Sequence, residues 1–445
     1  MQAEKRTGWF MLFILACVLS AAPMPAWASE TDALLNKLVQ KGILTSSEAQ
    51  EVRNEMAQES GPAGESRAAD TKDVVKKMAG GTWLDTVKWS GDLRLRYEDE
   101  MREPAANRSR ERFRLRFGFV AKPWDPLEMG VRLASGTSGN PVSTNQTFTG
   151  TFDKKALFID QAYGRYTPWK TGTGPLSGLS LVGGKMENPF VTTPEGIVWD
   201  PDVTPEGVAM QWKDPVNLPL VDRLLPIRPF ANVGAFRISE LSADEGDPGL
   251  IGYQAGADID LPWWGMGFQP SIAYYDFIGI KGIATSNVTN GPSGNTTTSG
   301  AYTSDYNLVS TQGKLTFPSV FGQPVALLAD YTYNNYKHIG GGSSEDAVDD
   351  GGAYTVGAEA GKVTEKLGSW KAFFFRKRIE PDAAFGAITD SDFGSGGTNH
   401  KGYIMGLQVG LNKWASMGLK YFRSDEIEGT QNKVDTFQAD VLLKY

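Results

Sequence analysis

Two stretches near residue 100 alternate strictly between apolar and charged side chains. Leu93, Leu95 and Tyr97 alternate with Arg94 and Arg96. The next stretch repeats the pattern, with Phe113, Leu115, Phe117 and Phe119 between Arg110, Arg112, Arg114 and Arg116. Successive side chains of a strand point to opposite faces, so each stretch predicts a strand with one apolar and one charged face. The alternation alone fits both a soluble sandwich and a membrane barrel.

The number and spacing of such stretches favour the barrel. The pattern predicts sixteen strands, over residues 86–98, 109–121, 126–135, 156–167, 177–187, 205–214, 226–239, 250–261, 266–280, 304–317, 323–336, 352–363, 367–379, 401–412, 415–424 and 433–445. An even number of strands, each of about ten residues, is typical of outer-membrane barrels. We therefore predict an all-β fold, a transmembrane antiparallel up-and-down barrel of about sixteen strands.

The connections between these strands alternate between short turns and long polar links. Most tryptophans lie in or beside the short turns, namely Trp124, Trp169, Trp212, Trp263, Trp264, Trp370 and Trp414. Indole rings favour the interface between membrane and water, so the clustering predicts an aromatic girdle at one end of the barrel. Core tryptophans would have no reason to prefer alternate connections. The short turns are predicted to face the periplasm and the long links to face outward.

The N-terminus predicts export. Residues 1–28 have the features of a signal peptide, because Lys5 and Arg6 precede an apolar run and the small residues Ala26 and Ala28 form a cleavage site. The only cysteine lies within this segment, so the mature chain would have no disulfide. We expect the protein to be exported to the cell outer membrane.

A helical segment is predicted between the signal peptide and the barrel. Within residues 29–60, leucines such as Leu34 and Leu38 recur at helical spacing, which predicts a coiled-coil-like periplasmic segment. Residues 61–85 are polar and predict a linker, and 86–445 form the predicted barrel. The helices could serve oligomerisation or cell-wall contact, or act only as a spacer.

Composition excludes several other classes. The formal net charge is −8, which disfavours nucleic acid as a partner. No later segment has the roughly 18 continuous apolar residues of a membrane helix. The mature chain has only His338 and His400, and no serine lies in a nucleophile elbow, so we predict no catalytic residues, no metal site, no cofactor and no enzymatic activity.

Several motifs resemble one family of Gram-negative barrels. Gly91–Glu98 and Arg110–Gly118 are similar to the opening of the "putative porin" family, and Gly184–Phe190, Trp199–Asp202 and Glu206–Ala209 are similar to a second block of it. The resemblance covers nearly the whole mature chain. It implies a barrel of sixteen to eighteen strands, passive transport, a relation to phosphate-selective porins, and homotrimers.

Two groups of residues are candidates for pore selectivity. Arg94, Arg96, Arg110, Arg112, Arg114 and Arg116 would face the lumen as a basic ladder that attracts anions. The alternative is cross-strand charge pairing with Asp92 and Glu98 on a wet wall. The link 188–205 resembles the porin loop that folds into the channel, and it would place Asp200, Asp202 and Glu206 opposite the arginines.

Two function hypotheses follow. The main one is a diffusion porin with a lean toward anions, whose partners are small hydrophilic solutes or ions, outer-membrane lipid and lipopolysaccharide. The second is a structural or adhesive barrel with a plugged pore and an N-terminal arm that contacts the cell wall. Electrical conductance would distinguish the two.

Overall fold

The computed structural model describes residues 85–169, 176–213, 225–241, 246–262, 264–336, 351–429 and 432–445. The chain divides into two compact units, residues 1–82 and 83–445. All described residues belong to the second unit. The predicted signal peptide and helical segment, and almost all of the predicted linker, lie outside the described residues.

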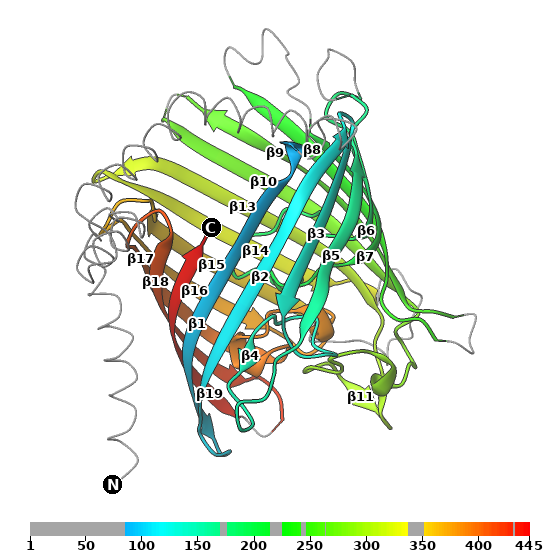
Figure 1. Cartoon of the computed structure of the whole chain (residues 1–445). Helices are drawn as coiled ribbons and strands as arrows, with labels where there is room; N and C mark the ends of the chain where they lie inside the picture. Colours follow the sequence, from blue (N-terminus) through cyan, green and yellow to red (C-terminus); the bar gives the residue numbers. More distant parts are fainter. Residues whose placement is uncertain are drawn as a thin grey trace, which may run out of the picture. The chain divides into compact units, whose positions relative to one another are not determined.

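One antiparallel sheet closes on itself to form a barrel (Figure 1). The described strands are β1 Lys88–Glu103, β2 Arg108–Trp124, β3 Leu127–Ser135, β4 Gln146–Thr147, β5 Leu157–Tyr166, β6 Ser180–Lys185, β7 Glu206–Lys213, β8 Ile227–Arg237, β9 Gly249–Leu261, β10 Met266–Ile278, β11 Thr297–Thr298, β12 Ala301–Tyr302, β13 Tyr306–Val320, β14 Gln323–Asn334, β15 Gly352–Gly361, β16 Trp370–Ile379, β17 His400–Gly410, β18 Ala415–Glu426 and β19 Lys433–Lys444. The barrel sheet contains seventeen of them, and β4 is only a two-residue addition, so sixteen strands form the wall. The predicted fold class and strand number are confirmed.

The barrel closes where the first strand meets the last. Leu93 of β1 lies opposite Leu115 of β2 on one side and opposite Leu443 of β19 on the other. Closure gives every wall strand two hydrogen-bonded neighbours, as hydrocarbon surroundings require. Among the described residues, no helix has the length and hydropathy needed to cross a membrane.

Two strands begin well inside the start that their sequence pattern predicts. β6 begins at Ser180 and β16 at Trp370, each three residues inside the predicted start. Gly178 and Gly368 have φ values of 75° and 80°, which strand backbone does not adopt. The apolar residues before each strand therefore belong to turns. At the other end of the barrel, β1 continues to Glu103, beyond the predicted end.

The two ends of the barrel differ as predicted. The turn between β13 and β14 contains only Phe321 and Gly322, both with positive φ, which matches the twist of a two-residue hairpin. Trp124, Trp264 and Trp414 lie at this turn end and are 52–68% exposed. Trp263 is outside the described residues. The position of the tryptophans at the turn end is confirmed, and their contact with a membrane interface stays a prediction.

The outer face of the wall is apolar, whereas the lumen side is mixed. Exposed aliphatic and aromatic side chains project outward from many strands, including Ile159, Val208, Ile272, Leu327, Phe374 and Leu407. Buried polar and charged residues, including Arg96, Glu98, Gln254, Asp330, Lys377 and Gln438, lie on the alternate positions and face the lumen. This division is that of a membrane barrel with a polar interior.

Candidate functional site

The lumen face of β1 and β2 carries the six arginines that the alternation predicted. Arg94 lies directly opposite Arg114, and Arg96 directly opposite Arg112. Like charges opposite each other destabilise a sheet unless opposite charges intervene. The packing of these guanidinium groups therefore requires nearby carboxylates, and β1 itself supplies three of them, Asp92, Glu98 and Glu100.

Asp92 and Glu98 bridge the arginines in two groups. The carboxylate of Asp92 accepts hydrogen bonds from Nε of Arg114 and from Nε of Arg116, each at 2.9 Å. Glu98 forms ion pairs with Arg110 and with Arg112, the latter at 3.3 Å. The cross-strand charge pairing that we weighed as the alternative to an anion ladder is therefore present on this wall.

Arg94 and Arg96 differ in their partners. Arg96 donates from Nε to Asp440 of β19 at 2.7 Å and from Nη1 to Asp392 at 3.1 Å. Arg94 donates to the amide oxygen of Asn145 at 2.6 Å. Within the described part of the chain, Arg94 forms no ion pair with a carboxylate. Of the six arginines, Arg94 is therefore the one whose charge no carboxylate compensates at close range.

The link between β6 and β7, residues 186–205, crosses the lumen to the opposite wall. Lys377 of β16 donates to the carbonyl oxygen of Gly196 at 3.0 Å, and Lys420 of β18 pairs with Glu195 at 2.6 Å. The N–H of Ile197 donates to the buried carboxylate of Asp330 on β14 at 3.3 Å. We call residues 186–205 the inward loop. The predicted constriction loop folds inside the barrel.

Two of the three predicted loop carboxylates line the eyelet, and one of them contacts the arginine wall. Asp202 lies 3.5 Å from Arg116 and 4.0 Å from Arg114, and it accepts hydrogen bonds from the N–H and hydroxyl of Thr144. Asp200 is 4% exposed and accepts a hydrogen bond from the N–H of Ser391 at 2.9 Å. Burial, with Asp202 and Asp390 nearby, raises the pKa of Asp200 well above its usual range.

Glu206 lies elsewhere. It is the first residue of β7, its side chain is 66% exposed, and it pairs with Lys185 at 2.9 Å. The structure thus does not bring Glu206 to the arginines. The physical reason is the start of the strand at this position, because pairing of β7 with β6 and β8 fixes the side chain outside the inward loop.

A second link contributes carboxylates that the sequence pattern did not single out. The link 380–399, between β16 and β17, also folds inward and places Asp390 3.0 Å from Lys377. Asp392 of the same link pairs with Arg96. Burial raises the pKa of Asp392, but Arg96, Lys420 and other nearby cations outweigh burial and hold it below its usual range. The link's length and its Asp-Ser-Asp sequence were the only available signals.

Together these groups surround a cavity of about 560 Å³ between the arginine wall and the inward loop. Cations and carboxylates alternate around it, because Asp440 lies beside Arg96 on one wall and Lys420 lies beside Glu195 of the loop. Its charged lining residues are Arg94, Arg96, Arg114, Lys420, Glu187, Glu195, Asp200, Asp202, Asp390, Asp392 and Asp440. We call this cavity the eyelet. Arg110, Arg112 and Arg116 lie outside it.

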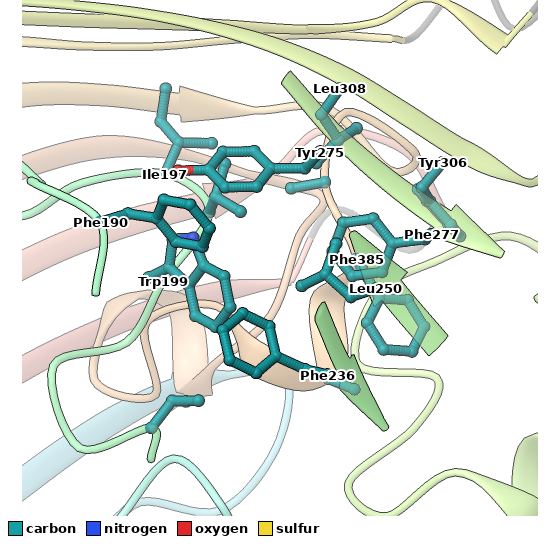
Figure 2. Close-up of a cluster of buried hydrophobic side chains, with 14 of the residues drawn as sticks. Phe190, Ile197, Trp199, Phe236, Leu250, Tyr275, Phe277, Tyr306, Leu308 and Phe385 are labelled. Carbon is teal, nitrogen blue, oxygen red and sulfur yellow. The ribbon is translucent and has the colours of Figure 1, made fainter. Parts of the chain in front are cut away.

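The other side of the inward loop packs against an apolar wall (Figure 2). Phe190 and Trp199 of the loop meet Tyr275 of β10 at ring-centroid distances of 5.1 and 5.9 Å. Phe385 of the link 380–399 packs 5.2 Å from Phe277. This cluster, which also contains Ile197, Phe236, Leu250, Tyr306 and Leu308, is buried inside the barrel. It attaches both loops to the wall formed by β8, β9, β10 and β13.

Further hollows adjoin the eyelet on both sides. A cavity of about 560 Å³ toward the loop end shares Trp199 and Asp202 with the eyelet lining. A small cavity of about 60 Å³ shares Thr193 with the eyelet, and it shares Gln269 with a cavity of about 270 Å³ toward the turn end. Adjacent hollows with common lining residues therefore follow one another along the lumen.

A closed sixteen-stranded barrel, with an apolar exterior and a charged constriction made by inward loops, defines the class of outer-membrane porins. The family described as "Putative porin" matches residues 101–314 and 294–445. The chain therefore belongs to that family. The family and the barrel support a location in the outer membrane, and they are those of a channel rather than of an enzyme.

A solved structure shares the fold of this barrel. Pseudomonas putida OprB superposes with a TM-score of 0.52 at 12% identity, covering 81% of this chain and 95% of that one. Salmonella typhi OmpF, solved with daunomycin, gives a TM-score of 0.46 at 11% identity, covering 82% and 99%. No curated protein sequence matches this chain.

Proposed function

We propose that the protein is a passive diffusion porin in which the eyelet selects small hydrophilic solutes and ions. The observation that carries the proposal is the eyelet itself, a charged hollow of about 560 Å³ across the lumen, flanked by further hollows toward both ends. Polar side chains along the lumen give a passing solute hydrogen-bond partners in place of the water molecules that it loses. The plugged structural barrel is the weaker hypothesis because the eyelet is a hollow lined mainly by charged and polar side chains.

The charge of the eyelet bears on ion preference. Its lining contains four cations and seven carboxylates, a formal charge of −3, or −2 with Asp200 protonated. The expected lean toward anions rested on the ladder of six arginines, and five of them have carboxylate partners. We therefore propose a weak preference for cations, with Arg94 as the positive group that moderates it. This ion preference is the opposite of the anion preference that the arginine ladder alone predicted.

Four finer expectations stay predictions. They are cleavage before Ser29, assembly as a homotrimer, contact with lipopolysaccharide, and kinship with phosphate-selective porins. The absence of catalytic residues and cofactors is also a prediction. None of them is needed for diffusion through the eyelet.

The test is single-channel recording of the purified protein in a planar bilayer, with the reversal potential measured across a salt gradient. Steady conductance supports the porin, and cation preference supports the eyelet charge count. A folded, heat-modifiable barrel that never conducts would exclude the porin and favour the structural hypothesis. A variant lacking residues 191–198 of the inward loop should conduct more per channel, which distinguishes flow through the eyelet from leakage around the barrel.

A further inference from the structure

The outer face of β16 to β19 changes from apolar to charged at one level across all four strands. The register places Phe374, Met405, Tyr421 and Phe437 in one row. The next row toward the loop end contains Arg376, Tyr403, Arg423 and Asp435, and the row after it contains Arg378, Lys401, Asp425 and Lys433. Phe375, Lys377 and Ile379 are buried on the lumen side, so these rows project outward.

The charged rows stop at β16. Continuing the third row across the sheet, Arg378 lies opposite Tyr354 of β15, which lies opposite Tyr331 of β14. Tyr331 in turn lies opposite Thr311 of β13. The same level of the barrel is therefore uncharged on β13, β14 and β15. The cations form a local patch rather than a ring around the barrel, and we call Arg376, Arg378, Lys401, Arg423 and Lys433 the rim patch.

The rim patch has more cations than carboxylates. Arg378 pairs with Glu380 at 3.1 Å. In the described chain, the other four members form no ion pair. Asp425 and Asp435 share the rows with them, and Glu103 of β1 lies opposite Lys433, so with Glu380 five cations face four carboxylates in all. An excess of cations at this level calls for an anionic neighbour outside the protein.

One guanidinium is already oriented along the wall. Arg376 lies over the ring of Tyr403 at 4.5 Å from its centroid, and Tyr403 is 40% exposed. Stacking on an aromatic ring holds a guanidinium flat. Nη1 of Arg376 also donates to the carbonyl oxygen of Gly402 at 3.4 Å, and its other N–H groups can donate to a ligand. Arg423 is exposed on the adjacent strand, next to the same tyrosine in the register.

We propose that the rim patch binds the phosphate groups of an anionic membrane lipid in the leaflet at the loop end of the barrel. Guanidinium groups bind phosphate oxygens in pairs, and lysines near a membrane surface attract anionic headgroups. The row of Phe374 and Met405, next to the rim patch on the side of the turn end, would contact the acyl chains. The change from apolar to charged residues would then follow the boundary between acyl chains and headgroups. The inference rests on the membrane location of the barrel and not on conduction through the eyelet.

The experiment is native mass spectrometry of the full-length protein released from neutral detergent. The probes are bis-phosphorylated lipid A, its monophosphorylated form and phosphatidylcholine. We expect retention to fall in that order. The triple variant Arg376→Gln, Lys401→Gln, Arg423→Gln should retain roughly tenfold less of the bis-phosphorylated lipid. Arg237→Gln is the matched control, an exposed loop-end arginine of β8 paired with Asp247 at 3.2 Å, and it should retain as much as the wild type.

Two further measurements keep the outcomes distinct. Heat-modifiable migration shows whether the triple variant is folded, and Arg376→Lys with Arg423→Lys should recover part of the binding because charge is retained. Equal retention of phosphatidylcholine, or no loss in a folded triple variant, would overturn the proposal. A change of oligomeric state in the triple variant without any change in lipid retention would also overturn it, and would indicate that a second copy of the chain occupies the patch.

Discussion

Two parts of the lumen wall use opposite chemistry. The wall of β19, β1 and β2 carries Arg94, Arg96 and Arg114 with their carboxylates, whereas the wall of β8, β9, β10 and β13 carries Phe236, Tyr275 and other apolar side chains. Both walls belong to the same closed β-sheet. The difference shows that the lumen of this barrel is not a uniform wet surface.

The inward loop joins the two walls. Phe190 and Trp199 pack on the apolar wall, while Asp202 pairs with the arginines across the eyelet. Burial of aromatic rings anchors the loop, since each ring removes a large apolar area from water. The charged side of the loop then lines the eyelet. We infer that stability of the constriction lies on one side of the lumen and selectivity on the other.

The largest expected effect comes from the apolar side. Phe190→Ala should lower the free energy of unfolding by about 3–5 kcal/mol, because it leaves a cavity beside Tyr275. The loop should loosen and single-channel conductance should become larger and noisier. Urea titration in detergent and bilayer recording would measure the two effects. The control is Phe374→Ala on the lipid face, and an equal loss of stability in both variants would refute the anchoring role.

A buried cation should have the next largest effect. Lys377 is fully buried and holds both Gly196 of the inward loop and Asp390 of the link 380–399. Lys377→Met leaves the carboxylate of Asp390 without this partner and should cost about 3 kcal/mol in urea titration. Adding Asp390→Asn should restore part of the stability. If the double variant is as unstable as the sum of the two single variants, the pair does not couple the loops.

A smaller effect is expected at the charged wall. Arg94→Gln removes the arginine that lacks an ion pair, so the reversal potential should shift further toward cations. Arg110→Gln is the matched control, since Arg110 pairs with Glu100 at 2.6 Å and lies outside the eyelet. Equal shifts in the two variants would mean that the potential reports the net charge of the lumen and not the eyelet.

The smallest effect is a dependence on pH. The pKa of Asp200 is raised by burial and by Asp202 and Asp390, so its carboxyl takes up a proton as the pH falls through that raised value. Cation preference should decline below that pH. Stability from the neutral form is present at low pH and is lost as the pH rises through the raised pKa. Asp200→Asn should flatten both curves, and unchanged curves would assign the titration to another group.

Much of the barrel could be predicted from alternation alone. The strands that contain Leu93, Arg94 and Phe437 were predicted correctly, because alternation with a period of two residues shows which face of a strand contacts hydrocarbon. The later starts of β6 and β16 could not be predicted, because Leu179 and Leu367 beside Gly178 and Gly368 extend the apolar pattern while the backbone turns. Turn conformation and side-chain pattern carry separate information.

The partners of the arginines were beyond reach of the sequence. Asp392 and Asp440 reach Arg96 from 296 and 344 residues away in the chain. Loop conformation has no periodicity, so neither the inward fold of 380–399 nor the exposure of Glu206 could be read from the pattern. The apolar cluster around Phe190 was equally hidden, because an apolar residue at a lumen position looks like an exception to the alternation.

The sequence by itself determined that this chain closes into a sixteen-stranded barrel with arginines on its inner face, because alternation along each strand separates a face in hydrocarbon from a face in the lumen. Only the tertiary structure decided what those arginines meet. Two loops return into the lumen, bring carboxylates from distant segments, and pack their aromatic residues on the opposite wall. Net charge at the constriction is a sum over contacts between remote segments, and such contacts exist only after the barrel closes.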